Sequence, residues 1–64
     1  MNNPFCVGDM FKSYDNEFTY RIDSIKGTMM RVVILNNEKH SIVTKAYDIG
    51  DFAEQVNNGT IEKM

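Results

Sequence analysis

Hydrophobic and polar residues alternate along much of the chain, and the clearest case is the segment 17–26. Every second residue from Phe18 to Ile22 is apolar and the residues between them are polar, which is the period of a strand with one buried face. Ile25 falls out of that phase by one position, so we expect a bulge or bend near residues 23–24.

Three further segments have strand character. The segment 10–14 is short and is followed by a polar turn, and 40–45 follows another such turn. The segment 28–35 is rich in β-branched residues and apolar on both parities except at Arg31, which is typical of a central strand. Strands spaced by about ten residues with tight turns predict an antiparallel meander.

The hydrophobic period changes towards the C-terminus. From Ile49 to Val56, apolar residues recur at intervals of three and four, which predicts an amphipathic helix over 48–57. Asp48 is a suitable N-cap, and Gly59 supplies a stop where the left-handed conformation is easily adopted.

Together these patterns predict one mostly-β domain over residues 1–64, with a single short helix near the C-terminus and a possible last strand at 60–63. The architecture is a small antiparallel barrel or a strongly curved sheet of four or five strands. Phe5 and Val7 are expected beneath the first strand, and the Met29–Met30 pair should place one side chain on each face. The expected core comprises Phe11, Phe18, Tyr20, Ile22, Val32, Ile34, Ile42, Phe52, Val56 and Ile61.

A chain of 64 residues builds a core of only about 3–5 kcal/mol net stability. Cys6 is the sole cysteine and His40 the sole histidine, so no internal disulfide forms and we expect no metal site and no cofactor. The remaining sources of stability are good packing and self-association, and a homodimer is an open alternative.

The sequence holds no run of about 20 apolar residues, and the segment 1–4 has neither the basic nor the apolar region of a signal peptide. We therefore expect a stand-alone cytoplasmic protein with no membrane partner.

Catalysis is not expected, because the chain has few side chains that could act as nucleophile or base. His40 lies beside a predicted turn and Cys6 in an apolar stretch, so we expect an exposed histidine and a buried cysteine. The glycines are scattered rather than grouped in a phosphate-binding loop. We expect a binding protein and no enzyme.

Charges separate along the chain, with basic residues in excess over 10–45 and only acidic ones from Asp48 to Val56. A protein partner is the first expectation, through a strand edge, the strand surface or the acidic helix. Nucleic acid is the alternative, through the basic residues with Tyr14 or Tyr47, although the net charge of −2 argues against it. Arg21 and Arg31 could come near each other across the sheet, unless neighbouring carboxylates already neutralise them. The candidate binding residues are Lys12, Tyr14, Arg21, Arg31, Lys45, Tyr47, Asp48, Asp51 and Glu54.

The opening Phe5-Cys6-Val7-Gly8-Asp9-Met10-Phe11 resembles the start of many SH3-like small barrels. With the strands that follow and the Asn58-Gly59-Thr60-Ile61 end, the whole layout looks like the short proteins that tailed bacteriophages encode. This resemblance implies an SH3-like barrel that binds and redirects or inhibits a host factor in the host cytoplasm. It brings no catalytic residues, and SH3-like barrels include RNA-, DNA- and peptide-binding members.

Overall fold

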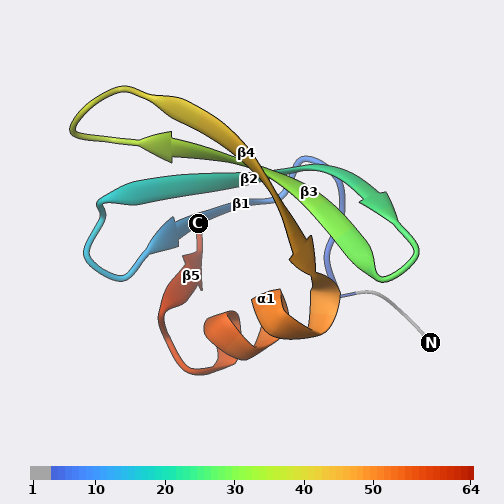
Figure 1. The fold of residues 1–64 in the computed structure, drawn as a ribbon. Helices are drawn as coiled ribbons and strands as arrows, with labels where there is room; N and C mark the ends of the chain where they lie inside the picture. Colours follow the sequence, from blue (N-terminus) through green and yellow to red (C-terminus); the bar gives the residue numbers. More distant parts are fainter. Residues whose placement is uncertain (1–3) are drawn as a thin grey trace.

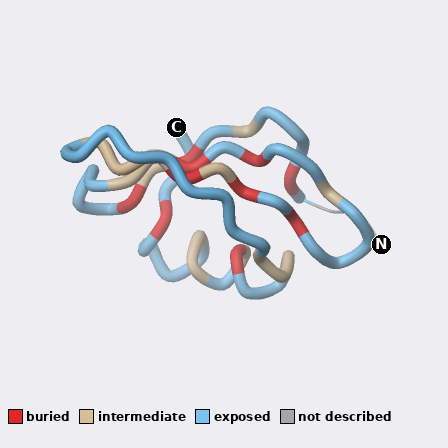
Figure 2. The backbone as a smooth tube through the Cα atoms, turned by 45° about the horizontal axis from the view of Figure 1, so that its top comes forward, coloured by how far each residue is buried: buried red, intermediate tan, exposed pale blue. Residues whose placement is uncertain are grey.

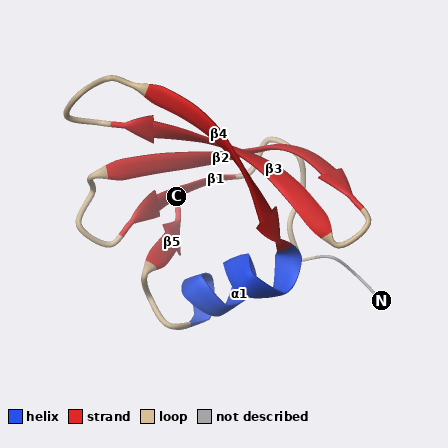
Figure 3. Ribbon diagram, viewed as in Figure 1, coloured by secondary structure: helices blue, strands red, loops and turns tan. Residues whose placement is uncertain are grey.

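The computed structural model describes residues 4–64, which fold into one curved antiparallel sheet and one helix (Figures 1 and 3). The elements are β1 (Met10–Ser13), β2 (Phe18–Lys26), β3 (Met29–Asn36), β4 (Ile42–Asp48), α1 (Ile49–Asn57) and β5 (Ile61–Lys63). The strand order is β4-β3-β2-β1-β5. The mostly-β class with a single helix is therefore confirmed. The curved sheet is the form adopted, because no ladder within residues 4–64 joins β4 to β5 to close a barrel.

β2 and β3 are the longest strands and form the centre of the sheet. Their register shifts between Ile22 and Ser24, which confirms the predicted bulge. Gly27, at φ 61°, lies in the turn between them, a conformation that a glycine adopts without a steric penalty.

The helix begins and ends where its sequence signals predict. Asp48 is extended (ψ 137°) and its carboxylate accepts a hydrogen bond from Gly50 N–H at 2.8 Å, so it caps a helix dipole that is positive at this end. At the other end, Asn58 N–H donates to the Glu54 carbonyl, and Gly59 has φ 85°. The helix then packs beneath the sheet between β4 and β5 (Figure 1).

The face of the sheet towards α1, called the inner face here, carries the core. Phe52 is fully buried, and its ring lies 5.3 Å from that of Phe5 and 5.2 Å from that of Phe11 in edge-to-face geometry, the arrangement that aromatic rings prefer. The buried apolar residues are Phe5, Phe11, Tyr20, Ile22, Met30, Val32, Ile34, Phe52 and Ile61.

Figure 2 shows buried positions along the strands and in the helix, with the hairpin loops mostly exposed. Three core expectations need correction. Ile42 is 66% exposed, because it lies on an edge strand and on the outer face, away from α1. Phe18 and Val56 are only half-buried, since they lie at the margins of the packed region. Met30 is buried while Met29 is exposed, which confirms that the pair is split between the two faces.

The N-terminal segment is also arranged differently from the expectation. Phe5 is buried as predicted, but Val7 and Cys6 are exposed. The reason is a tight turn, in which Asp9 N–H donates to the Cys6 carbonyl at 3.0 Å and the Asp9 carboxylate accepts from Cys6 N–H at 2.9 Å. The turn directs one apolar side chain inward and leaves the next two outside.

Candidate protein-binding edge

β4 forms one edge of the sheet, because β3 is its only strand neighbour within residues 4–64. Two hydrogen bonds bracket the β3–β4 ladder. Asn36 N–H donates to the Ser41 carbonyl at 2.8 Å at one end, and Ile49 N–H donates to the Thr28 carbonyl at 2.8 Å at the other. In an antiparallel pair, residues bonded in this way alternate with residues whose N–H and C=O point away from the neighbour.

Both ends of the ladder give the same phase for β4. The positions that hydrogen-bond with β3 are Val43, Lys45 and Tyr47. The alternating positions, which do not bond with β3, are Ile42, Thr44 and Ala46. The N–H and C=O groups of these last three residues therefore point outward along the free edge. They form a row to which another strand can bind.

The side chains of β4 give this edge little protection. Ile42 and Val43 are 66% and 58% exposed, and they point to opposite faces of the sheet. β4 contains no proline, and its register with β3 is unbroken. Lys45 is the one charged residue between the two ends of the strand. Natural edge strands are usually short, charged, kinked or covered, so β4 is an exception.

The opposite edge shows the usual protection. β5 has three residues, and its exposed positions carry Glu62 and Lys63. Lys63 Nζ lies 3.1 Å from an Asp9 carboxylate oxygen, and Glu62 lies 4.0 Å from Lys12 Nζ. A short, charged strand discourages pairing with another chain. The two edges of the sheet therefore differ in kind, and only β4 has the features of a binding edge.

A groove of about 420 Å³ runs beside β4, between this strand and α1. On the strand side, Lys45 Nζ lies 5.3 Å from the centre of the Tyr47 ring, a cation–π distance. On the helix side, Asp51 and Glu54 line the groove. The structure thus brings together five of the predicted binding residues here: Lys45, Tyr47, Asp48, Asp51 and Glu54.

Other predicted basic residues lie elsewhere, on the outer face of the sheet. The registers place Lys12, Arg21 and Arg31 on that face, whereas Lys45 shares the inner face with its β3 partner Val32. Arg21 lies 3.8 Å from Asp23, so a neighbouring carboxylate does partly neutralise it. Arg31 is opposite Ser24 rather than Arg21. The proposed nucleic-acid surface is therefore divided between two faces.

The tyrosines are separated as well. Tyr14 is 68% exposed just after β1. Tyr47 is half-buried, with its ring 5.3 Å from that of Phe52, so one side of it belongs to the core. Tyr20 is buried, and burial raises the pKa of its hydroxyl. Of the two candidate stacking residues, Tyr14 alone is freely accessible.

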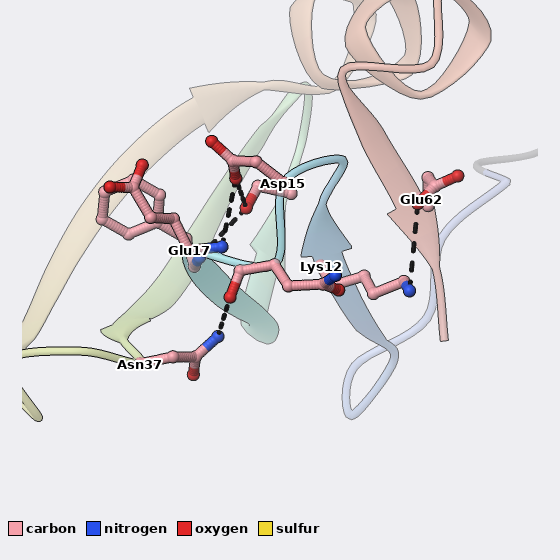
Figure 4. A network of polar contacts seen from close by, with 8 residues as sticks. Lys12, Asp15, Glu17, Asn37 and Glu62 are labelled. Carbon is pink, nitrogen blue, oxygen red and sulfur yellow. Dashed lines mark hydrogen bonds and ion pairs between the residues drawn. The ribbon is translucent and has the colours of Figure 1, made fainter.

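Polar side chains around the β1–β2 turn have structural partners (Figure 4). Asp15 accepts hydrogen bonds from the Ser13 hydroxyl at 2.7 Å and from Glu17 N–H at 3.0 Å, and these bonds lower the pKa of its carboxyl group. Asn37 Nδ2 donates to the Asn16 carbonyl at 2.9 Å, which ties this turn to the end of β3. We assign these groups to folding rather than to binding.

The sole cysteine, Cys6, and the sole histidine, His40, both lie at the surface. The expectation of a buried cysteine is therefore wrong, and that of an exposed histidine is confirmed. His40 has φ 58° in the loop before β4. No group of three histidine, cysteine or carboxylate side chains among residues 4–64 is placed to hold a metal ion.

Sequence reasoning missed the exposure of β4. The sequence pattern predicts Ile42 in the core, and it indicates a strand edge as a binding surface without identifying which strand. The signal that was present is the pair Ile42-Val43 itself, in which adjacent apolar residues must point to opposite faces of a strand. At most one of the two faces of this small sheet is covered by the single helix.

No protein-family model matches this chain, and no curated protein or solved structure gives a significant match to it. Within residues 4–64, the single helix is too short to cross a membrane.

Proposed function

We propose that this chain is a non-enzymatic protein-binding regulator that acts by accepting an extended segment of a partner protein along β4. The observation that carries the proposal is the outward row of backbone groups at Ile42, Thr44 and Ala46. Strand addition of this kind takes affinity from main-chain hydrogen bonds and specificity from the alternating side chains. Exposed Ile42 and Val43 supply apolar area on both faces of the edge.

The amide hydrogens of β4 give a direct test. In the free protein, we expect the N–H groups of Val43 and Lys45 to be protected by their hydrogen bonds to β3, and those of Ile42, Thr44 and Ala46 to exchange quickly. Binding of a partner strand should slow exchange at these three outward positions and leave Val43 and Lys45 nearly unchanged. Protection that arises elsewhere, with the outward positions still exchanging fast, would place the binding surface off this edge.

The partner itself can be obtained by affinity capture from the source cells, with protein and nucleic acid both analysed. Thr44→Pro removes an outward N–H while leaving the bonds to β3 intact. A genuine edge partner should be recovered with the wild-type chain and with Thr44→Ala, which keeps the outward N–H at the same position, and be lost with Thr44→Pro. Circular dichroism checks that the proline variant keeps its fold.

A second candidate is nucleic-acid binding on the outer face, favoured by the placement of Lys12, Arg21 and Arg31 on one side of the sheet. Two of the three already have carboxylate neighbours, Glu62 and Asp23, which weakens the electrostatic field that phosphate contacts need. Affinity for a short duplex or single strand that falls steeply with salt, and falls further in Arg31→Gln, would support this function over the first.

A further inference from the structure

The groove beside β4 lies where the side chains of an added strand would project. Residues directly opposite each other in a sheet point to the same face. Residues of a partner strand opposite Lys45 and Tyr47 would therefore point to the inner face, into the space between β4 and α1. The helix side of that space is formed by Asp51, Glu54, Gln55 and Asn58.

The charge of this groove is negative. Asp48 already accepts a hydrogen bond from Gly50 N–H, and the Lys45 ammonium lies over the Tyr47 ring. Within residues 4–64, neither Asp51 nor Glu54 takes part in an ion pair or a side-chain hydrogen bond. The helix side therefore presents two carboxylates with no cationic partner to whatever occupies the groove.

We propose that the segment bound by β4 carries a lysine or arginine opposite Tyr47, directed into the groove towards Asp51 and Glu54. This inference rests on the proposed function, because it specifies the strand that the edge accepts. The position opposite Lys45 should be uncharged or acidic, since like charges placed opposite each other are unfavourable. The position opposite Val43 should be apolar. The partner is thus an antiparallel strand with a single basic residue among its inward side chains.

A second copy of the chain fits this edge less well than a foreign segment. If two β4 strands pair about Ala46, Lys45 of each copy stands opposite Tyr47 of the other, but Ile42 and Val43 then extend past the strand, opposite the start of α1. If they pair about Thr44, both apolar residues are covered, but Ser41 stands opposite Tyr47. Pairing about Lys45 places the two Lys45 ammonium groups opposite each other, which is unfavourable. Pairing about Val43 covers both apolar residues, but the residue opposite Tyr47 is then Lys39, which lies in the β3–β4 turn before the strand, next to His40 at φ 58°. No symmetric register therefore both directs a cation from the strand into the groove and covers the exposed apolar pair.

Three blocked synthetic peptides test the proposal, each an alternating Thr/Val strand that differs only at one central position, occupied by Lys, Gln or Glu. We expect the Lys peptide to bind about three- to tenfold more tightly than the Gln peptide at low salt, and the Glu peptide to bind more weakly than both. In Asp51→Asn/Glu54→Gln, the preference for Lys should disappear while affinity for the Gln peptide is kept. Glu17→Gln/Glu38→Gln removes the same charge from exposed turns and should retain the preference.

The outcomes separate this inference from the proposed function. Equal affinity for all three peptides would overturn the basic-strand inference and leave strand addition in place. Binding of none of them by the wild-type chain would count against both. Thr44→Pro, with Ile42→Pro as a second variant at the first strand position, should abolish binding of every peptide. A stable dimer in analytical ultracentrifugation that dissociates in these two variants would assign the edge to a second copy and overturn the inference.

Discussion

Ile34 and Val43 are directly paired across β3 and β4 on the inner face, yet Ile34 is 8% exposed and Val43 58%. Paired residues on one face have the same surroundings above them unless the covering layer ends between them. The core therefore ends at β3 in this part of the sheet, and β4 extends beyond it. Figure 1 shows the same feature as the β3–β4 hairpin projecting past α1.

This boundary predicts unequal effects of truncating the two residues. Ile34→Ala should lower the free energy of unfolding by about 2–4 kcal/mol, because it leaves a cavity in the core. Val43→Ala should change it by less than about 1 kcal/mol, since that side chain is already largely in water. Urea unfolding followed by circular dichroism measures both. Similar losses for the two variants would mean that another surface covers β4.

Phe52 is the residue on which the attachment of the helix most depends. It is fully buried and its ring contacts those of Phe5, Phe11, Tyr20 and Tyr47. We expect Phe52→Ala to reduce stability by about 3–5 kcal/mol, which is comparable to the whole stability of so small a domain. The variant should be largely unfolded in thermal denaturation. Glu54→Ala, an exposed change on the same helix, serves as the control and should unfold close to the wild-type temperature.

Most of the architecture could be predicted from the sequence, because it depends on local periodicity. The alternation through β2, the Asp48 cap and the Gly59 stop each use neighbouring residues only, and each lies where the pattern indicates. The ends of the strands are predicted less accurately than their centres. β4 continues to Asp48, three residues beyond the end of the predicted segment 40–45. β4 runs directly into α1, and no glycine or proline within the strand marks its end.

The candidate site could be predicted only in part, because it depends on which strands lie side by side. The sequence predicts Lys45, Asp51 and Glu54, among others, as binding residues. Their convergence on one groove follows from α1 folding back beneath β4. The exposure of Ile42 follows from the strand order. Neither fact is encoded in a local pattern, since an edge strand and a central strand can have the same alternation.

Acid should destabilise the β1–β2 turn through Asp15. Hydrogen bonds from Ser13 and from the backbone lower the pKa of this carboxyl group below 3.8 in the folded chain. Above that value both folded and unfolded states are ionised, and the stabilisation is complete. As the pH falls below it, the unfolded state binds the proton first, so stability decreases until the folded carboxylate is also protonated.

Asp15→Asn tests this pH dependence. Between about pH 7 and about pH 3, the urea midpoint of the variant should fall less than that of the wild-type chain, because one linked proton has been removed. Asp9 has a pKa lowered by the Cys6 backbone N–H and by Lys63, so it should contribute a similar acid sensitivity, and Asp9→Asn gives the parallel measurement. An unchanged pH profile in both variants would contradict the role given to these hydrogen bonds.

The unprotected β4 edge should also make the isolated chain prone to aggregate when no partner is present. Exposed apolar edge strands template pairing with other chains, and a charge placed within their apolar segment commonly suppresses it; Lys45 lies outside the exposed pair Ile42-Val43. Val43→Lys should therefore slow the growth of light scattering and thioflavin fluorescence in concentrated, gently heated samples. Val7→Lys adds the same charge at an equally exposed residue outside the strands and should have little effect. If both lysines suppress aggregation equally, the cause is net charge rather than the free edge of β4.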